Sequence, residues 1–256
     1  MMKEIIMITG ASSGMGREFA MQIEKKYQVD EIWVIARRKE RLENLKERLQ
    51  TKVRIFALDL TQKESFEIIQ EALFQEKPRV KALINCSGYG KLNHYENISI
   101  EVIENMMNLN MLAVVKMVNS VLPYMHKKSS IVNLASCSGY MPIPYLNIYA
   151  STKAFVLSYS RALNEELKYR QIHVLAICPY WVETEFFDRA VVKDKKPVVI
   201  RYGKVYKAKD VIKKAIKDME SSKDVSLYGT INRIQILGMK VLPHRLVKKI
   251  WMIYQE

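Results

Sequence analysis

Tyr149 and Lys153 have the residue types and the spacing to carry out proton transfer. They lie in "NIYASTKAF", which predicts the start of a helix, so both side chains share one helical face, one turn apart. A neighbouring ammonium stabilises a phenolate, and such a tyrosine can exchange a proton with a substrate. Taken alone, an ordinary surface pair is favoured by roughly ten to one. The choice therefore depends on the rest of the chain.

The glycine-rich stretch "TGASSGMG" follows the first apolar run and precedes a predicted helix. Gly10, Gly14 and Gly16 permit a tight turn, and they let a pyrophosphate approach the backbone amides at the helix N-terminus. Ser12 and Ser13 add hydroxyl donors. The spacing differs from the P-loop and from GxGxxG. The stretch predicts a dinucleotide site, and the alternative is a strand–helix turn without a ligand.

The second apolar run ends in "ARRKE". An acidic residue at this point selects NAD by accepting a hydrogen bond from the ribose 2′-hydroxyl, whereas a 2′-phosphate needs cations. Ala36 is followed here by Arg37 and Arg38. NADP(H) is therefore predicted over NAD(H). The alternative is that both arginines form the first turn of an exposed helix.

Polar residues also stand near the ends of later predicted strands. Asp59 could accept a hydrogen bond from an adenine amino group, or it could cap the next helix. "NCSG", residues 85–88, has small side chains where a flat ring or a ribose could pass. Asn110 lies within a predicted helix, where a buried amide needs partners. Ser136 lies thirteen residues before Tyr149.

The elements that must position these residues alternate along the chain. Strands are predicted at 4–9, 31–36, 53–59, 80–86, 130–136, 172–178 and 225–228. Helices are predicted at 14–27, 38–50, 64–76, 99–127, around Tyr149 and Lys153, and at 208–221 and 243–255. Apolar strands between such helices predict βαβ units and a parallel sheet covered on both faces.

We therefore expect an α/β fold: a doubly wound Rossmann fold with a mostly parallel, seven-stranded sheet. The length of 256 residues predicts a single domain over 1–256. Residues 180–207 have weak periodicity and predict a substrate lid. The aromatic residues of this lid, together with Lys193, Lys195, Lys196 and Arg201, favour an extended apolar substrate with an anionic group. Solvated lysines are the alternative.

Over essentially its whole length, the chain resembles the short-chain dehydrogenase/reductase family. The matching motifs are "TGASSGMG", Asp59, "NCSG", Asn110, Ser136, "YASTK" and "PYWVET". The resemblance implies a catalytic group of Ser136, Tyr149, Lys153 and Asn110. It also implies that Pro179, Val182 and Thr184 flank the nicotinamide. The predicted cofactor contacts are Gly10, Ser12, Ser13, Gly14, Met15, Gly16, Arg37, Arg38, Asp59, Leu60, Asn85, Ser87, Gly88, Tyr149, Lys153, Pro179, Val182 and Thr184.

Four positions depart from the family pattern. Cys86 and Ser87 stand where the family usually has Asn-Ala, and Ala135 stands where a second serine usually precedes Ser136. Tyr180 replaces the usual glycine after the proline, which narrows the nicotinamide pocket and puts the substrate range in doubt.

The resemblance predicts an NADP(H)-dependent oxidoreductase that interconverts a ketone or aldehyde and a secondary alcohol by hydride transfer. An acyl or steroid-like substrate is expected. Tyr149 would give the proton, Ser136 would hold the carbonyl oxygen, Asn110 would anchor a water that links Lys153 to solvent, and Lys153 would bond the nicotinamide ribose. Lys153 and the positive nicotinamide are expected to lower the pKa of Tyr149 by ~2–3 units. The alternative function is a catalytically idle nucleotide-binding regulatory protein.

The composition also indicates whether disulfides, a metal site or a membrane segment are to be expected. Cys86, Cys137 and Cys178 have no paired spacing, which favours reduced thiols in the cytoplasm over disulfides or zinc. The four histidines are scattered, so no metal is expected. The apolar run at the N-terminus is too short for a signal peptide or a membrane span.

The net charge of +14 is concentrated in residues 189–256, which carry 17 Lys/Arg against 6 Asp/Glu. The cations are spread along helices without a recognition motif, so nucleic acid is not expected. In residues 243–255, Leu246, Ile250, Ile253 and Tyr254 share one helical face. Packing of that face on the substrate cleft or on a partner in a homodimer or homotetramer is favoured. Contact with a membrane surface is the other interpretation.

Overall fold

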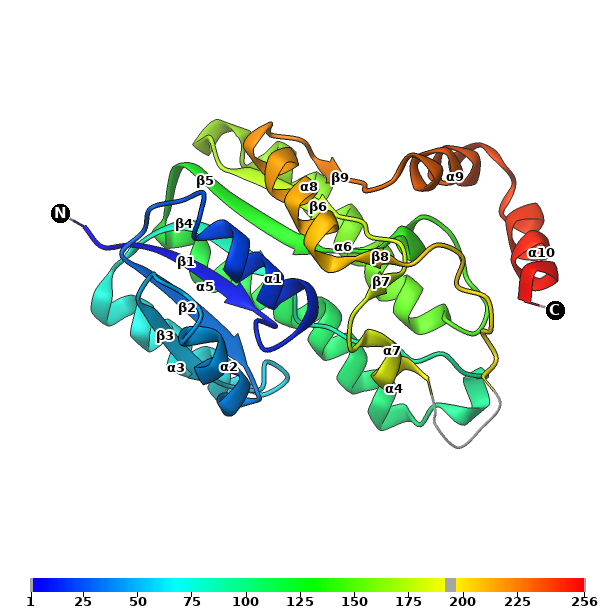
Figure 1. The fold of residues 1–256 in the computed structure, drawn as a ribbon, viewed down its shortest axis with the longest axis horizontal. Helices are drawn as coiled ribbons and strands as arrows, with labels where there is room; N and C mark the ends of the chain where they lie inside the picture. Colours follow the sequence, from blue (N-terminus) through cyan, green and yellow to red (C-terminus); the bar gives the residue numbers. More distant parts are fainter. Residues whose placement is uncertain (1, 192–196, 256) are drawn as a thin grey trace.

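The computed structural model describes residues 2–191 and 197–255, and a seven-stranded parallel sheet forms its centre (Figure 1). The strands are β1 (Glu4–Thr9), β2 (Glu31–Ala36), β3 (Val53–Ala57), β4 (Arg79–Asn85), β5 (Met125–Leu134), β6 (His173–Ile177) and β9 (Val225–Ser226). Their order is β3-β2-β1-β4-β5-β6-β9, so the direction of winding reverses between β1 and β4. The predicted doubly wound fold is confirmed. Ligands of such sheets bind where the winding reverses, at the carboxyl ends of the strands.

Helices cover both faces of the sheet. One face packs on α1 (Gly14–Ile23), α2 (Lys39–Lys46) and α8 (Ala208–Glu220). The other packs on α3 (Lys63–Glu76), α5 (Ala113–Val121) and α6 (Asn147–Glu166). The remaining longer helices are α4 (Ile100–Met107), α9 (Thr230–Val241) and α10 (His244–Gln255). Within the described part of the chain, every helix is too short or too polar to traverse a lipid bilayer.

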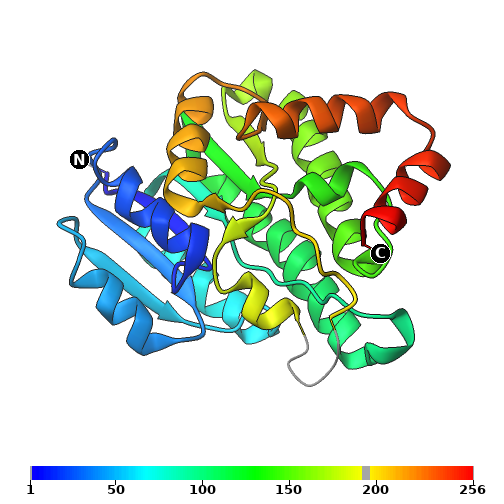
Figure 2. The same cartoon turned by 45° about the vertical axis from the view of Figure 1, so that its right-hand side comes forward.

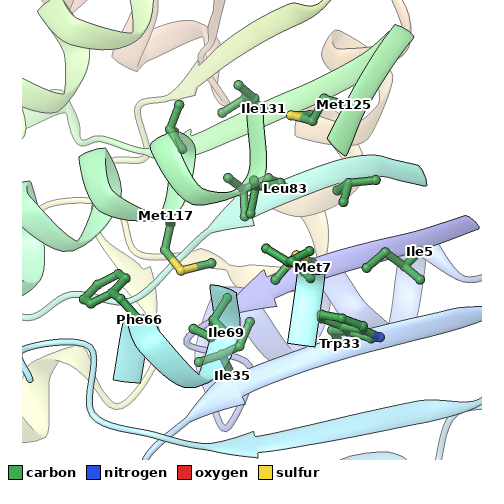
Figure 3. Close-up of a cluster of buried hydrophobic side chains, with 14 of the residues drawn as sticks. Ile5, Met7, Trp33, Ile35, Phe66, Ile69, Leu83, Met117, Met125 and Ile131 are labelled. Carbon is green, nitrogen blue, oxygen red and sulfur yellow. The ribbon is translucent and has the colours of Figure 1, made fainter. Parts of the chain in front are cut away.

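Alternate residues of each strand supply the two cores, because successive side chains of a strand point to opposite faces. In β1, Ile5 and Met7 join the core beneath α3 and α5, whereas Ile6 and Ile8 join the core beneath α1. Figure 3 shows the first of these cores, where strand residues meet α3 and α5. The labelled side chains are Ile5, Met7, Trp33, Ile35, Phe66, Ile69, Leu83, Met117, Met125 and Ile131. This packing on both faces fixes the strand ends that carry the site.

The predicted helix over 99–127 is wrong at its C-terminal end. The chain forms α4, a π-helical turn over Asn108–Leu112, and α5, and then a short 3₁₀ turn that contains Pro123. Strand β5 already begins at Met125. Proline has no N–H to continue a helix, so the helix ends before it. Between Met125 and Ser130 the pairing with β4 is irregular, and the Ser129 hydroxyl donates to Val80 O at 2.8 Å.

Other predicted boundaries run too far by a few residues. Helix α1 ends at Ile23, α2 ends at Lys46, and β9 ends at Ser226. Strand β3 ends at Ala57 because the chain then turns, with the Thr61 N–H donating to Asp59 Oδ1 at 3.0 Å.

Helices α7 (Phe186–Ala190) and α9 were not predicted. The signal for α9 was present, since Ile231, Ile234, Leu237 and Val241 recur at spacings of three and four residues. Gly238 within that stretch weakens the pattern. Figures 1 and 2 show α9 and α10 at the end of the molecule opposite β2 and β3.

Candidate active site

Tyr149, Lys153 and Ser136 come together at the end of β5. Tyr149 lies in the first turn of α6 and Lys153 in the next, with its ammonium nitrogen 5.6 Å from the centroid of the Tyr149 ring. The Lys153 ammonium is buried and donates to Leu134 O at 2.7 Å. Ser136 lies two residues beyond β5, and its hydroxyl is close enough to the Tyr149 phenol to act on the pKa of that phenol. A substrate oxygen beside that hydroxyl pair would meet two donors.

Asn110 lies behind the Tyr149–Lys153–Ser136 group and does not line the cleft. It is fully buried in the π-helical turn. Its side-chain oxygen accepts from the Tyr89 N–H at 3.1 Å, and its amide nitrogen donates to Tyr89 O at 2.9 Å and to the Thr152 hydroxyl at 3.1 Å. Thr152 in turn donates to Tyr149 O at 2.7 Å. Asn110 therefore ties the loop after β4 to the first turn of α6, and the water predicted beside its side chain stays a prediction.

Burial dominates the acid–base properties of Tyr149 and Lys153. Desolvation raises the pKa of Tyr149 above its ordinary value, while Ser136 acts in the opposite direction. Desolvation also lowers the pKa of Lys153 to about 8. The lowered tyrosine pKa expected from the sequence is not produced by the protein's own groups, since burial outweighs the effect of Ser136. A bound nicotinamide cation would add a positive charge that favours the phenolate.

The glycine-rich turn after β1 fits a dinucleotide pyrophosphate. Gly10 and Gly14 have positive φ, at 69° and 52°, which glycine adopts at little cost. A Cβ on Gly10 would lie only 2.8 Å from the backbone of Cys86 and Ser87. Helix α1 begins at Gly14, so its first N–H groups point toward the turn. The turn is thus a tight backbone cradle, and a side chain at Gly10 would clash with the chain that follows β4.

An arginine cluster adjoins this turn. Arg38 donates to the hydroxyls of Ser13 at 2.9 Å and Ser12 at 3.2 Å. It also donates to the Glu185 carboxylate at 2.8 Å, and Arg41 bonds the other oxygen of that carboxylate. Arg38 is therefore directed at the glycine-rich turn rather than into solvent, and its predicted contact with a 2′-phosphate stays a prediction.

Three further members of this cluster were missed from the sequence: Arg41, Glu185 and Arg189. Burial lowers the pKa of Arg189, and the nearby guanidiniums of Arg38 and Arg37 lower it further. Arg38, Arg41 and Arg189 thus lie around Glu185, while Arg37 pairs with Asp59, so arginines outnumber carboxylates in an environment that favours an added anion. Distant sequence positions become neighbours here only because the segment after β6 folds back over the end of β2.

Asp59 lies at the edge of the same cleft. Its carboxylate accepts from the N–H and the hydroxyl of Thr61, and it lies 3.5 Å from Arg37. Burial acts to raise the pKa of Asp59, but these hydrogen bonds and the Arg37 charge outweigh it and lower the pKa. The carboxylate does not cap α3, whose N-cap residue is Gln62.

Most of the predicted cofactor contacts line this one cleft. They are Gly10, Ser12, Ser13, Gly14, Met15, Gly16, Arg37, Arg38, Asp59, Leu60, Ser87, Gly88, Tyr149, Lys153, Pro179, Val182 and Thr184. Asn85 does not, because its side chain points into the core and donates to Asn133 Oδ1 at 2.9 Å. Asn85 is the last residue of β4, and the residues that follow it in "NCSG" line the cleft.

The same cleft continues past Tyr149 along an apolar wall. Trp181 and Phe186 were predicted there from the lid, and the Phe186 ring lies 5.2 Å from the Tyr149 ring. Sequence reasoning missed the other members, Met141, Ile143, Leu146, Met239 and Trp251. They come from the segment before α6 and from α9 and α10, so only the tertiary structure unites them.

Of the cations predicted for the lid, only Arg201 lies within the described residues. Lys193, Lys195 and Lys196 lie outside the described residues. Arg201 is exposed, does not line the cleft, and donates to Tyr254 O at 3.1 Å at the end of α10. The lid over 180–207 therefore stays a prediction. Within residues 2–191 and 197–255, no cluster of His, Cys, Asp and Glu could hold a metal.

The family model of short chain dehydrogenases matches residues 4–195. The chain belongs to that family. It is 30% identical to the very-long-chain 3-oxoacyl-CoA reductase of Mus musculus, over 96% of this chain and 83% of that protein. It is 34% identical to the 3-ketodihydrosphingosine reductase of Bacteroides thetaiotaomicron, over 73% of this chain and 67% of that protein. A short-chain dehydrogenase from Sphingobium yanoikuyae, solved in complex with NADPH, superposes with a TM-score of 0.77 at 27% identity, covering 92% of each chain.

Membership of the short-chain dehydrogenase family confirms the resemblance seen in the sequence motifs. The protein is an oxidoreductase that acts on alcohol or keto groups with a nicotinamide cofactor. The alternative of a catalytically idle regulator gains no support from these relatives.

Proposed function

We propose that the protein is an NADP(H)-dependent reductase of a ketone on an extended apolar chain. The observation that carries the proposal is one cleft lined by three groups of residues. These are the arginines beside the phosphate cradle, the Ser136–Tyr149–Lys153 group, and the apolar wall that reaches Trp251. The names of the mouse and Bacteroides relatives, which describe reductases of 3-oxoacyl-CoA and 3-ketodihydrosphingosine, support the same substrate class.

The residues of the chain divide the reaction between them. Bound NADPH supplies the hydride to the carbonyl carbon. Tyr149 donates its phenolic proton to the carbonyl oxygen, so that a secondary alcohol forms, and Ser136 donates a hydrogen bond to the same oxygen. Lys153 holds a positive charge near the phenol and returns the proton from solvent. Asn110 positions the first turn of α6 through Thr152. The apolar wall excludes water and binds the chain of the substrate.

The chain-length dependence of turnover tests this proposal. We expect kcat/KM for a series of 3-oxoacyl thioesters to rise with chain length, by up to about tenfold for each pair of added methylenes that enters the cleft. Met141→Trp fills part of the apolar wall, and it should lower kcat/KM for long chains while short ones change little. Met107→Trp, at an exposed position on α4, is the matched control. A flat chain-length profile in the parent protein would contradict the apolar-chain proposal.

Glu185 gives a second test, directed at the cofactor. Its carboxylate bonds Arg38 and Arg41, and it competes with a 2′-phosphate for those guanidiniums. Glu185→Gln should therefore lower the KM for NADPH by roughly threefold to tenfold and leave the KM for NADH unchanged. The exposed neighbour Glu183 supplies the control, Glu183→Gln. A higher KM for NADPH in Glu185→Gln would show instead that the carboxylate holds the arginines in place.

We also propose a homodimer or homotetramer in the cytoplasm. Buried, unpaired Cys86, Cys137 and Cys178 support a reducing compartment.

Exposed apolar side chains on the neighbouring α4–α6 region, at Met107, Leu112 and Phe155, support self-association. Light scattering coupled to size-exclusion chromatography measures the oligomeric state directly.

A further inference from the structure

Several large apolar side chains of the two C-terminal helices, α9 and α10, are exposed to solvent. On α9, Ile231, Ile234, Leu237 and Val241 are between 58% and 77% exposed. With 3.6 residues per turn they form a stripe along one side of the helix. Asn232 and Ile236, which bury α9 against the body, lie on the opposite side. The stripe therefore points directly away from the protein.

Helix α10 repeats this arrangement. It packs on the body through Val247, Trp251 and Gln255, which are one turn apart and buried. Leu246 and Ile250, at 44% and 52% exposure, lie on another side of the helix. The sequence predicted that the face of Leu246 and Ile250 packs on the cleft or on a partner. The first of these is wrong, because the face with Trp251 reaches the cleft instead.

The charged residues of these two helices are all basic, and Glu256 follows α10 in the sequence. Residues 230–255 contain five Lys/Arg and no Asp or Glu. The cations are Arg233 and Lys240 on α9, and Arg245, Lys248 and Lys249 on α10. Pairing this surface with its copy in a second subunit would bring the ten Lys/Arg of these helices together, which opposes self-association. An anionic surface would neutralise them.

We propose that the exposed apolar face of α9 and α10 docks on an anionic membrane surface. An amphipathic helix binds there by burying apolar side chains at the level of the acyl chains, while flanking Lys and Arg contact anionic headgroups. Both components are present on these two helices, and the pair lies at one end of the molecule (Figures 1 and 2). The binding is peripheral, since neither helix is long enough to span a bilayer.

The proposed surface adjoins the substrate cleft. Met239 of α9 and Trp251 of α10 line the apolar wall, while the outward sides of the same helices carry the exposed stripe. Docking would therefore place the apolar end of the cleft beside the lipid, where a long-chain substrate partitions. This consequence rests on the proposed function, whereas membrane binding itself does not.

Co-sedimentation with vesicles tests the proposal. We expect the parent protein to bind vesicles that contain phosphatidylserine in phosphatidylcholine, to bind pure phosphatidylcholine more weakly, and to be released by salt. Leu237→Asp with Ile250→Asp should lower the partition coefficient at least tenfold. Ile68→Asp with Phe74→Asp, at exposed apolar positions on α3, should leave it unchanged.

The basic residues are tested separately, with milder substitutions. Lys248→Gln with Lys249→Gln should lower binding to the anionic vesicles roughly tenfold to thirtyfold. Lys213→Gln with Lys217→Gln removes the same charge from exposed positions on α8 and should have a small effect. Circular dichroism and turnover of a water-soluble ketone show that each variant is folded.

Three results would overturn the proposal. The first is no binding of the parent protein to anionic vesicles. The second is equal loss of binding in the α3 and α8 control variants. The third is dissociation of an oligomer by Leu237→Asp with Ile250→Asp in the absence of lipid, which would assign the face to a second copy of the chain. Since vesicle binding is measured without turnover, these outcomes are independent of the proposed reaction.

Discussion

Tyr149→Phe should lower kcat by a factor of about 10²–10⁴, because it removes the proton donor and leaves the shape of the cleft unchanged. The phenol lies in the cleft beside Ser136. NADPH binding should fall little, since the glycine-rich turn and the arginine cluster are untouched. Turnover is measured by NADPH absorbance and binding by nucleotide fluorescence.

Tyr140→Phe is the matched control for this prediction. Tyr140 is a nearby tyrosine with a strongly raised pKa, caused first by burial, but it does not line the cleft. Its variant should keep kcat within a few-fold of the parent protein. A near-normal kcat in Tyr149→Phe, with the control also active, would remove Tyr149 from the chemistry.

The second large effect concerns cofactor choice. We expect the parent protein to favour NADPH over NADH by more than tenfold in kcat/KM, which corresponds to over ~1.4 kcal/mol. Arg38→Ala should reduce that ratio by about tenfold to a hundredfold, since a hydrogen bond to a charged group contributes ~1.5–3 kcal/mol. Arg38 is the arginine that bonds the Ser12 and Ser13 hydroxyls at the phosphate cradle.

Lys39→Ala provides the control, because Lys39 follows Arg38 in the sequence and is largely exposed. It should leave the cofactor ratio unchanged. Ala36→Asp with Arg37→Ala should shrink or reverse the ratio, as an acid then faces the ribose 2′-hydroxyl. Equal use of both cofactors by the parent protein would show that the arginines do not bind the cofactor. Their role would then be to hold the predicted lid segment through their bonds to Glu185.

The sequence by itself determined the features that depend on local pattern. The alternation of apolar strands with amphipathic helices specified a doubly wound parallel sheet, because each apolar run needs cover on both faces. The spacing of Tyr149 and Lys153 specified one turn of one helix. The positive φ values of Gly10 and Gly14 follow from their residue type in a tight turn. These inferences need no knowledge of distant contacts.

The tertiary structure decided the features that depend on residues far apart in the chain. Arg38, Arg41 and Arg189 surround Glu185 only because the segment after β6 returns to the end of β2. The raised pKa of Tyr149 follows from burial, which cannot be read from the neighbouring residues in the sequence. Helix α10 has two apolar sides. The side with Trp251 packs on the body of the protein, whereas the side with Ile250 is exposed to solvent. A helical pattern shows which residues share a side, whereas the neighbouring elements decide which side is buried.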